Sequence, residues 1–292
     1  LGGQLTLEDM FLYQVKQRYP IHANFFLHDF YFMPLPSSSG IVLSQVFFLL
    51  SSFLDPQKSP QDFVNLRAQV MAYRWGFFDR GRYLGDNDYA NVPWLQLTSP
   101  PYLANLADFL EKNGLAELAL DKVPAIIEKP SAKTPPAIQE SNDTTHLTVV
   151  DSSGHVVSTT QTINGYFGSG IVEEKTGIVL NNEMDDFAAA PGAQNLFGAI
   201  GSLANKIEPG KRPLSSMSPT LVYQDGKLKM ALGSPSGTRI ISCVGQVITN
   251  RLVFGMNLYD AVAAARIHHQ WRPQELWWEA WGFSPQLKDQ FA

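Results

Sequence analysis

The stretch Thr144-Thr145-His146-Leu147-Thr148-Val149-Val150-Asp151, followed by Ser152-Ser153-Gly154, decides how this chain is interpreted. Its first eight residues are rich in β-branched side chains with a period of two, which is typical of a β-strand. Ser152-Ser153-Gly154 is a turn signal, and residues 155–163 predict the returning strand. A three-residue hairpin loop favours glycine in the left-handed conformation at its end. We therefore predict a hairpin with residues 152–154 as its loop.

The loop length determines which residues of the two strands face each other. With a loop of residues 152–154, Asp151 pairs with His155, and counting back along both strands places Thr144 opposite Thr162. A two-residue loop would place Thr144 opposite Gln161 instead. The turn therefore predicts two threonine hydroxyls side by side at the open end of the hairpin.

The region before residue 122 is predicted to be mostly helical. Helix starts are expected at Thr6, where Asp9 completes a capping box, and at Ser99-Pro100, with a stop at Asn113-Gly114. Ser59-Pro60 is read as the start of a helix that runs to about Asp79. The apolar run at residues 41–54 is shorter than the roughly 20 residues of a membrane span and predicts a buried helix.

Residues 122–143 contain four prolines among Lys, Ser and Glu residues, and predict an exposed linker. Beyond the hairpin, strands are expected at residues 177–180, 219–224 and 227–232, the last two joined by an Asp-Gly turn. Asn257 is expected to cap a helix that extends through Arg266. Strands followed by a helix within one segment favour a layered α+β fold over a doubly wound one.

Composition excludes several classes of protein. Apolar residues make up 45% of the 292 residues, which excludes a disordered chain. A net charge of −5 argues against a general polyanion binder, so no nucleic acid partner is expected. Cys243 is the single cysteine, which excludes an internal disulfide, and the histidine spacing gives no metal site. We expect neither a metal nor a cofactor.

Thr144, at the junction between the linker and the first strand of the hairpin, is the remaining candidate for a catalytic residue. A threonine hydroxyl is a weak nucleophile unless a base removes its proton. Cleavage of the preceding peptide bond would make the α-amine of Thr144 that base, because its ordinary pKa is about 7.7–8.0. No histidine or aspartate is then required.

Several blocks of this sequence resemble, in order and spacing, the γ-glutamyltransferase (γ-glutamyl transpeptidase) family. They are Thr144-Thr145-His146, Gly168-Ser169-Gly170-Ile171, Leu180-Asn181-Asn182-Glu183-Met184-Asp185-Asp186-Phe187, Lys211-Arg212-Pro213-Leu214-Ser215-Ser216-Met217-Ser218-Pro219 and His268-His269-Gln270-Trp271. Upstream, the similar blocks are Met33-Pro34-Leu35-Pro36-Ser37-Ser38-Ser39-Gly40, Asp79-Arg80, Tyr83-Leu84-Gly85-Asp86 and Val92-Pro93-Trp94. The resemblance covers nearly the whole chain.

The resemblance implies an N-terminal-nucleophile hydrolase fold, an αββα sandwich with two stacked antiparallel sheets, present here as a partial copy. By this resemblance, the precursor would cut itself at Asp143–Thr144 into a large and a small subunit. Residues 1–143 would then be the later part of the large subunit and residues 144–292 the small one, in one interleaved fold. Thr144 would attack γ-glutamyl amides such as glutathione and pass the acyl group to water, an amino acid or a peptide. The resemblance also implies export to the periplasm or the extracellular space.

The resemblance also implies the roles of individual residues. Thr162 would support the nucleophile, and the backbone N–H groups of Ser236 and Gly237 would form the oxyanion hole. The residues expected to hold the α-amino and α-carboxyl ends of the glutamyl group are Asn164, Glu183, Asp186, Ser215 and Ser216. His268 and His269 are expected to be structural.

The sequence departs from the family pattern at three points. Ser236 stands where the family has glycine, so a positive φ there would be strained. Phe197 occupies the position of a lid aromatic that often carries a hydroxyl. The family's carboxylate-clamping arginine would lie upstream of Leu1, and family members continue past Ala292.

Two other interpretations stay open. One is an N-terminal-threonine amidase for another substrate, such as an acylase or a polyglutamate-cleaving relative. The other is an unprocessed, inactive member that serves as a binding or structural protein.

Overall fold

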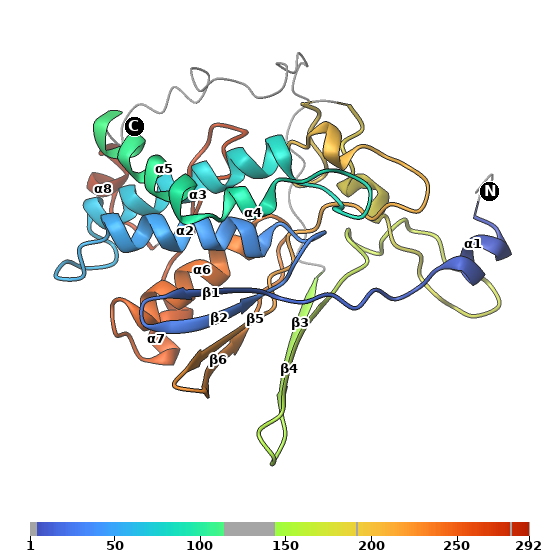
Figure 1. The fold of residues 1–292 in the computed structure, drawn as a ribbon, viewed down its shortest axis with the longest axis horizontal. Coiled ribbons are helices and arrows are strands. Elements are labelled where there is room, and N and C mark those ends of the chain that lie inside the picture. Colours follow the sequence, from blue (N-terminus) through green and yellow to red (C-terminus); the bar gives the residue numbers. More distant parts are fainter. Residues whose placement is uncertain (1–4, 114–143, 191, 281, 292) are drawn as a thin grey trace.

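The computed structural model of the chain describes residues 5–113, 144–190, 192–280 and 282–291. Its largest sheet is antiparallel, with the strand order β1-β2-β5-β6. The strands are β1 (Ile21–Phe25), β2 (His28–Phe32), β5 (Thr220–Gln224) and β6 (Lys227–Leu232). One sheet therefore combines two strands that precede Thr144 with two that follow it (Figure 1). Asp143 and the linker 122–143 lie outside the described residues.

The described part of the region before residue 122 is mostly helical, as predicted, but it also contains the strands β1 and β2, which the sequence did not predict. Their connection places Phe26 and Leu27 in the left-handed region, at φ 51° and 62°. Glycine or asparagine normally marks such a turn, so the usual hairpin signal is missing from the sequence. Phe30 and Phe32 are buried on one face of β2, while Tyr31 between them is exposed.

The predicted buried helix at residues 41–54 is confirmed as α2 (Ser39–Phe53). It packs on β1 and β2, and its Phe47 ring lies 5.3 Å from the ring of Phe30 and 5.9 Å from that of Phe25. The helix α3 (Phe63–Tyr83) runs along α2 and completes the main core.

Capping chemistry places the other upstream helices. The capping box of Thr6 and Asp9 starts α1 (Leu7–Leu12), as predicted, and Pro100 starts α5 (Pro100–Asn113). A short helix, α4 (Trp94–Leu97), precedes α5. For α3 the predicted start was wrong, because Asp62 caps it and accepts from Val64 N at 2.9 Å. The prediction also ended α3 at Asp79, four residues before its last residue.

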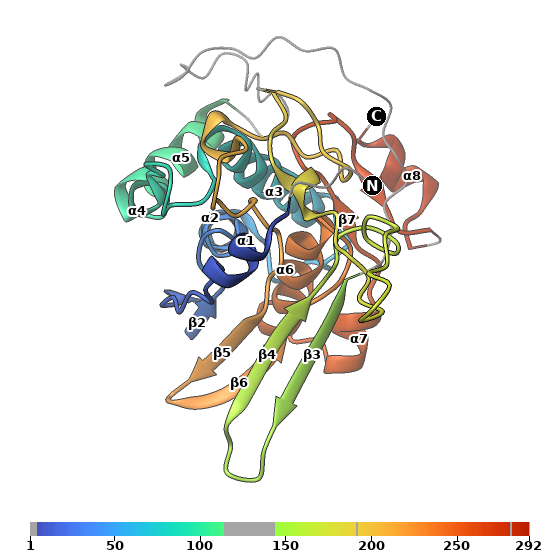
Figure 2. The same ribbon diagram turned by 90° about the vertical axis from the view of Figure 1, so that its right-hand side faces the viewer.

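The hairpin prediction is confirmed. Strands β3 (Thr145–Val150) and β4 (Val156–Gln161) pair with Val150 opposite Val156, and Gly154 has φ +86°. The hairpin lies beside β6, where the Ser158 hydroxyl donates to the Leu232 carbonyl at 3.2 Å (Figure 2). This register sets the position of Thr144 and Thr162, just beyond the paired strands.

Downstream predictions hold in part. Strands β5 and β6 form as expected, followed by α6 (Arg239–Leu252), α7 (Leu258–Ala263), β7 (Ile267–His268), β8 (Trp277–Trp278) and α8 (Pro285–Asp289). Asn257 caps α7, but this helix ends before the predicted Arg266. The strand expected at residues 177–180 is wrong, because this segment forms an isolated bridge between Val172 and Val179 instead of a strand. Two short 3-10 helices are η2 (Glu183–Asp186) and η3 (Leu203–Asn205).

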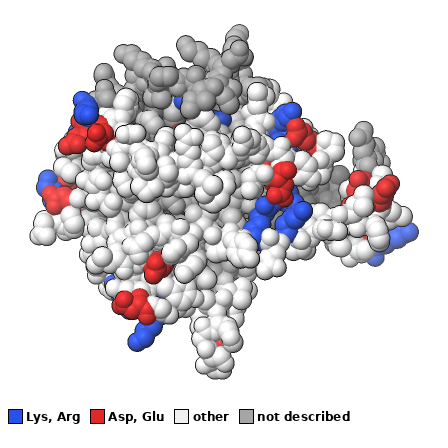
Figure 3. Space-filling view, in the orientation of Figure 1, with Lys and Arg blue, Asp and Glu red and all other residues white. Residues whose placement is uncertain are grey.

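Charged groups on the surface are mixed in sign. On the face shown in Figure 3, Lys and Arg side chains lie in small groups beside Asp and Glu, and most of the surface is uncharged. Among the described residues, no helix is both long enough and apolar enough to cross a membrane.

Gly85 and Asp86, which follow α3, contact two segments from the second half of the chain. The buried Asp86 carboxylate accepts from the backbone N–H of Arg212 at 3.0 Å. At Gly85 the chain approaches η3 so closely that a Cβ would lie 2.1 Å from the Ala204 carbonyl oxygen.

We predict that Gly85→Ala lowers the free energy of unfolding by about 3 kcal/mol, because backbone rather than a flexible side chain must move. Gly154→Ala is the matched control, since nothing lies within 4 Å of its added Cβ and only the positive φ opposes the change. It should cost about 1 kcal/mol. Urea denaturation of the full-length protein measures both, and equal losses would contradict the close approach at Gly85.

Candidate functional site

The predicted site residues come together around one pocket. Its lining consists of Arg80, Thr144, Thr162, Asn164, Glu183, Asp186, Asn195, Phe197, Ser215, Ser216, Met217, Gly237, Thr238 and Ile240. Every predicted site residue is in this set except Asp143, which is outside the described residues, and Ser236, which directly precedes Gly237. Residues separated by more than 150 positions therefore share one cavity.

The two threonine hydroxyls lie side by side, as the hairpin register predicts. Thr144 Oγ1 is 3.0 Å from Thr162 Oγ1 and donates to it. Thr162 Oγ1 also accepts from the backbone N–H of Asn164 at 2.9 Å. Thr144 is buried, so its hydroxyl is directed by this contact rather than by bulk water.

The residues that follow β4 are tied to η2. Asn164 has φ +74°, and its side-chain amide donates to the Asn182 carbonyl at 3.3 Å. The Asn182 side chain in turn accepts from the backbone N–H of Gly165 at 2.8 Å. These bonds place the carboxylates of η2 next to the threonine pair.

Two carboxyl groups of η2 face the pocket with raised pKa values. Burial raises the pKa of Glu183 to about 7, and its Oε1 atom has no hydrogen-bond partner among the described residues. Burial also raises the pKa of Asp186 to about 7, and the Glu183 carboxylate adds to this effect. Arg80 and a hydrogen bond of 2.8 Å from Asn195 Nδ2 act in the opposite direction. The pair is therefore poised to lose protons when a cation enters.

The serine-rich segment that leads into α2 forms hydrogen bonds with residues 215–217, which include the predicted site residues Ser215 and Ser216. Ser38 N donates to the Ser215 carbonyl at 2.8 Å, and Ser215 N donates to the Pro36 carbonyl at 2.8 Å. The Ser37 hydroxyl donates to the Met217 carbonyl at 2.7 Å. Residues 215–217 are thus fixed from a segment nearly 180 positions upstream.

Arg80 is a pocket residue to which the sequence reasoning assigned no role. It is buried near the end of α3, where its Nε donates to Ser38 Oγ at 3.1 Å and its Nη2 to Ser216 Oγ at 3.3 Å. Burial lowers the pKa of Arg80 to about 10, and the Asp186 carboxylate opposes that shift, so the guanidinium stays charged at neutral pH. The available signal was the pair Asp79-Arg80, which forms one of the blocks that resemble the family.

The turn before α6 carries the strain expected for a serine. Ser236 has φ +97° and Gly237 has φ +53°. A left-handed conformation costs about 1–2 kcal/mol for a residue other than glycine. Phe197 packs against this turn, since a Cβ on Gly237 would lie 2.4 Å from the ring. A side chain at position 237 is therefore excluded by the Phe197 ring.

Residues 1–292 match the sequence profile of the family described as Gamma-glutamyltranspeptidase. The chain belongs to this family. It is 43% identical over 290 residues to the glutathione hydrolase proenzyme of Escherichia coli strain K12, covering 97% of this chain and 47% of that protein. It is 39% identical over 277 residues to the glutathione hydrolase proenzyme of Pseudomonas aeruginosa, covering 94% and 47%. The chain thus spans about half the length of the curated relatives it matches.

A solved structure of low sequence identity shares the fold of this chain. The crystal structure of cephalosporin acylase from Bacillus halodurans superposes with a TM-score of 0.76 at 20% identity, covering 99% of this chain and 47% of that one. This likeness shows a shared fold. The predicted α+β architecture with antiparallel sheets is confirmed for the part of the fold that this chain contains.

No cluster of three or more His, Cys, Asp or Glu side chains that could hold a metal ion occurs within residues 5–113, 144–190, 192–280 and 282–291. His268 and His269 are buried, and burial lowers the pKa of His268 to about 4 and that of His269 to about 3. Both imidazoles are therefore neutral at physiological pH.

We predict that Arg80→Met raises the pKa of Asp186, because it removes the cation that favours the ionised carboxylate. Carbon-detected NMR titration of the full-length protein measures this pKa. Arg80→Lys is the control, since it keeps the charge and should move the pKa less. A pKa that is equal in wild type and Arg80→Met would contradict the electrostatic contact.

Proposed function

We propose that this chain is the nucleophile-bearing part of a γ-glutamyltransferase or glutathione hydrolase, with Thr144 as the N-terminal nucleophile. The observation that carries the proposal is the 3.0 Å contact between the Thr144 and Thr162 hydroxyls, at a pocket that is also lined by two carboxyl groups and two serines. The names of the relatives, glutathione hydrolase proenzymes, support the substrate class.

The reaction would begin with cleavage of the Asp143–Thr144 bond, which frees the α-amine of Thr144. This amine takes the hydroxyl proton as Oγ1 attacks the γ-carbonyl carbon. The backbone N–H groups of Ser236 and Gly237 stabilise the negative oxygen, with the N-terminal end of α6 directly behind them. The leaving amine takes the proton, and water or an acceptor amine then releases the acyl group.

The ends of the glutamyl group would be held by opposite charges. Glu183 and Asp186 lose their protons and bind the α-ammonium group, assisted by Asn164. Ser215 and Ser216 donate hydrogen bonds to the α-carboxylate. Arg80, bonded to Ser216 Oγ, adds a positive charge behind these hydroxyls.

This arrangement also bears on the alternatives. An acylase for an uncharged acyl group has no use for two carboxyls held at raised pKa beside an arginine, so the pocket favours an amino-acid-like acyl donor. An inactive homologue would retain an intact bond before Thr144. We further propose, from the family resemblance, a processed heterodimer of large and small subunits, no cofactor, and a periplasmic or extracellular location.

We predict that Thr144→Ala abolishes both self-cleavage and turnover of a γ-glutamyl anilide by the full-length protein. Thr162→Val keeps the side-chain shape but removes the hydroxyl, and should lower kcat about 10- to 100-fold. Intact-mass spectrometry reports cleavage, and anilide release reports turnover. Turnover that persists without Thr144 would refute the mechanism, and faster cleavage of other acyl anilides would favour the acylase alternative.

We predict that L-glutamate inhibits more weakly as pH falls below about 7. Protonation neutralises Glu183 and Asp186, and affinity falls up to about tenfold per pH unit for each carboxyl that must be ionised. Glu183→Gln should show a shallower slope, because one titrating group is lost and Asp186 ionises more easily. The Thr144 amine is present in both proteins, so the difference isolates Glu183. Identical slopes would contradict the binding role of Glu183.

A further inference from the structure

The block His268-His269-Gln270-Trp271 contains a buried amide that reaches two parts of the pocket wall. Gln270 follows β7, and its side chain lies between the segment around Phe197 and the turn that precedes α6. Both Gln270 and Phe197 are more than 90% buried. A buried amide in this position has its hydrogen bonds determined by its neighbours rather than by water.

On one side, Gln270 holds the segment of Phe197, which we call the lid segment (residues 195–199). Its Nε2 atom donates to the Phe197 carbonyl at 2.9 Å and to the Arg272 carbonyl at 3.2 Å. The lid segment is also tied to the acid pair, because Asn195 accepts from the backbone N–H of Phe197 at 3.0 Å and donates to Asp186.

On the other side, Gln270 holds the residue that follows Gly237. The Thr238 hydroxyl donates to Gln270 Oε1 in a short hydrogen bond, and His268 Nε2 lies 2.9 Å from the same oxygen. Thr238 is 1% exposed, and the first residue of α6 comes directly after it. This bond therefore restrains Thr238 and, through the chain, limits the movement of the adjoining Gly237.

The chemistry of the neighbours allows one orientation of the amide. Phe197 and Arg272 offer carbonyl oxygens, which accept hydrogen bonds only, so the NH₂ group must face them. Oε1 then accepts from Thr238 and from His268, which must carry its proton on Nε2. Nδ1 of His268 is left as an acceptor, 2.8 Å from Ser242 Oγ.

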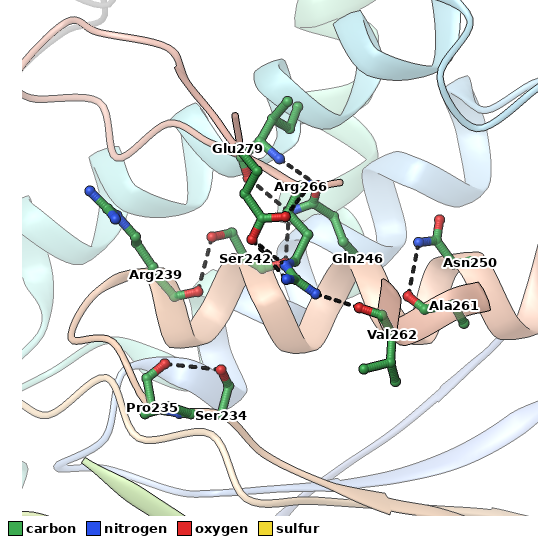
Figure 4. A network of polar contacts seen from close by, with 11 residues as sticks. Ser234, Pro235, Arg239, Ser242, Gln246, Asn250, Ala261, Val262, Arg266 and Glu279 are labelled. Carbon is green, nitrogen blue, oxygen red and sulfur yellow. Dashed lines mark hydrogen bonds and ion pairs between the residues drawn. The ribbon is translucent and has the colours of Figure 1, made fainter. Parts of the chain in front are cut away.

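The supporting layer beneath this amide comes from α6. Figure 4 shows Ser242, Gln246 and Asn250 along this helix, with the Ser242 hydroxyl 3.0 Å from the Arg239 carbonyl. Gln246 binds both the N–H and the carbonyl of Ile267, at 2.9 and 2.8 Å. These contacts fix β7, so Gln270 starts from a rigid base.

We infer that Gln270 is a positioning residue that couples the seating of the lid segment to the alignment of the Gly237 backbone N–H. The lid segment and the turn before α6 are already in contact, since Phe197 packs on Gly237. Gln270 links them a second time through hydrogen bonds. The part that concerns Gly237 as an oxyanion donor rests on the proposed function. The link between Thr238 and the lid segment does not.

Hydrogen exchange in the full-length protein tests the link. Gln270→Leu removes both sets of bonds and should speed exchange of the lid-segment amides at least tenfold. Thr238→Val removes only the hydroxyl of the turn, yet it should also speed lid exchange, because Gln270 loses the bond that orients it. The double variant should be no faster than Gln270→Leu. Effects that multiply in the double variant, or no change in lid exchange in either single variant, would overturn the coupling.

Asn65→Leu is the matched control for loss of a buried amide. Asn65 is fully buried and donates to the Asp55 and Ser59 carbonyls. It lies near the start of α3, whereas Gly81, near the end of the same helix, contacts Trp271 beside Gln270. Asn65→Leu should lower global stability. It should not speed exchange of the lid segment more than exchange of the rest of the protein. Selective exchange of the lid segment in Asn65→Leu would show that any destabilisation loosens the lid, which would overturn a specific role for Gln270.

Steady-state kinetics test the alignment. Gln270→Leu should lower kcat about tenfold or more while KM changes less than threefold, because the contacts to the glutamyl ends remain. Gln270→Glu keeps the acceptor for Thr238 and His268 and should retain more of kcat, although its lid exchange rises. An unchanged kcat in Gln270→Leu would overturn the proposal that Gln270 aligns the Gly237 backbone N–H. Should Thr144→Ala retain turnover, the proposed function fails, and lid exchange still decides the coupling.

Discussion

The antiparallel register of β3 and β4 is the constraint around which the pocket is arranged, because it leaves Thr144 Oγ1 3.0 Å from Thr162 Oγ1. A shift of one residue would turn one hydroxyl to the opposite face of the hairpin. The three-residue loop with Gly154 at φ +86° makes that shift unfavourable. Local turn chemistry at the far end of the hairpin thus determines a contact at its open end.

Charge is the second constraint on the pocket. Two carboxyl groups and one guanidinium are removed from water within one cavity, and burial opposes the charged form of each. Arg80 offsets part of this effect for Asp186, while Glu183 adds to it. Under the proposed function, these groups would face a ligand that carries both an ammonium and a carboxylate group. The same balance makes the site sensitive to pH near 7.

The upstream and downstream segments depend on each other. Serine contacts from residues 37–39 hold the Ser215–Met217 backbone, and Asp86 holds Arg212. Gln270 reaches from β7 to the Phe197 carbonyl and to Thr238. In each case a buried polar side chain satisfies a backbone or hydroxyl group from a distant segment, where an unpaired group would cost about 1–3 kcal/mol.

Local chemistry in the sequence determined the hairpin, its register, the caps of α1, α5 and α7 and the buried α2, because each depends on residues a few positions apart. Family resemblance supplied the other predicted site residues, but not every residue that lines the pocket. The sequence alone did not reveal β1 and β2, whose turn at Phe26-Leu27 lacks glycine, nor the role of Arg80 and Gln270. Those features depend on contacts between segments far apart in the sequence, such as Arg80 with Ser216 and Gln270 with Phe197. They exist only where β2 pairs with β5 and where the lid segment meets the turn before α6. Tertiary structure decided them because burial and hydrogen-bond partners belong to the packed chain and not to any local pattern.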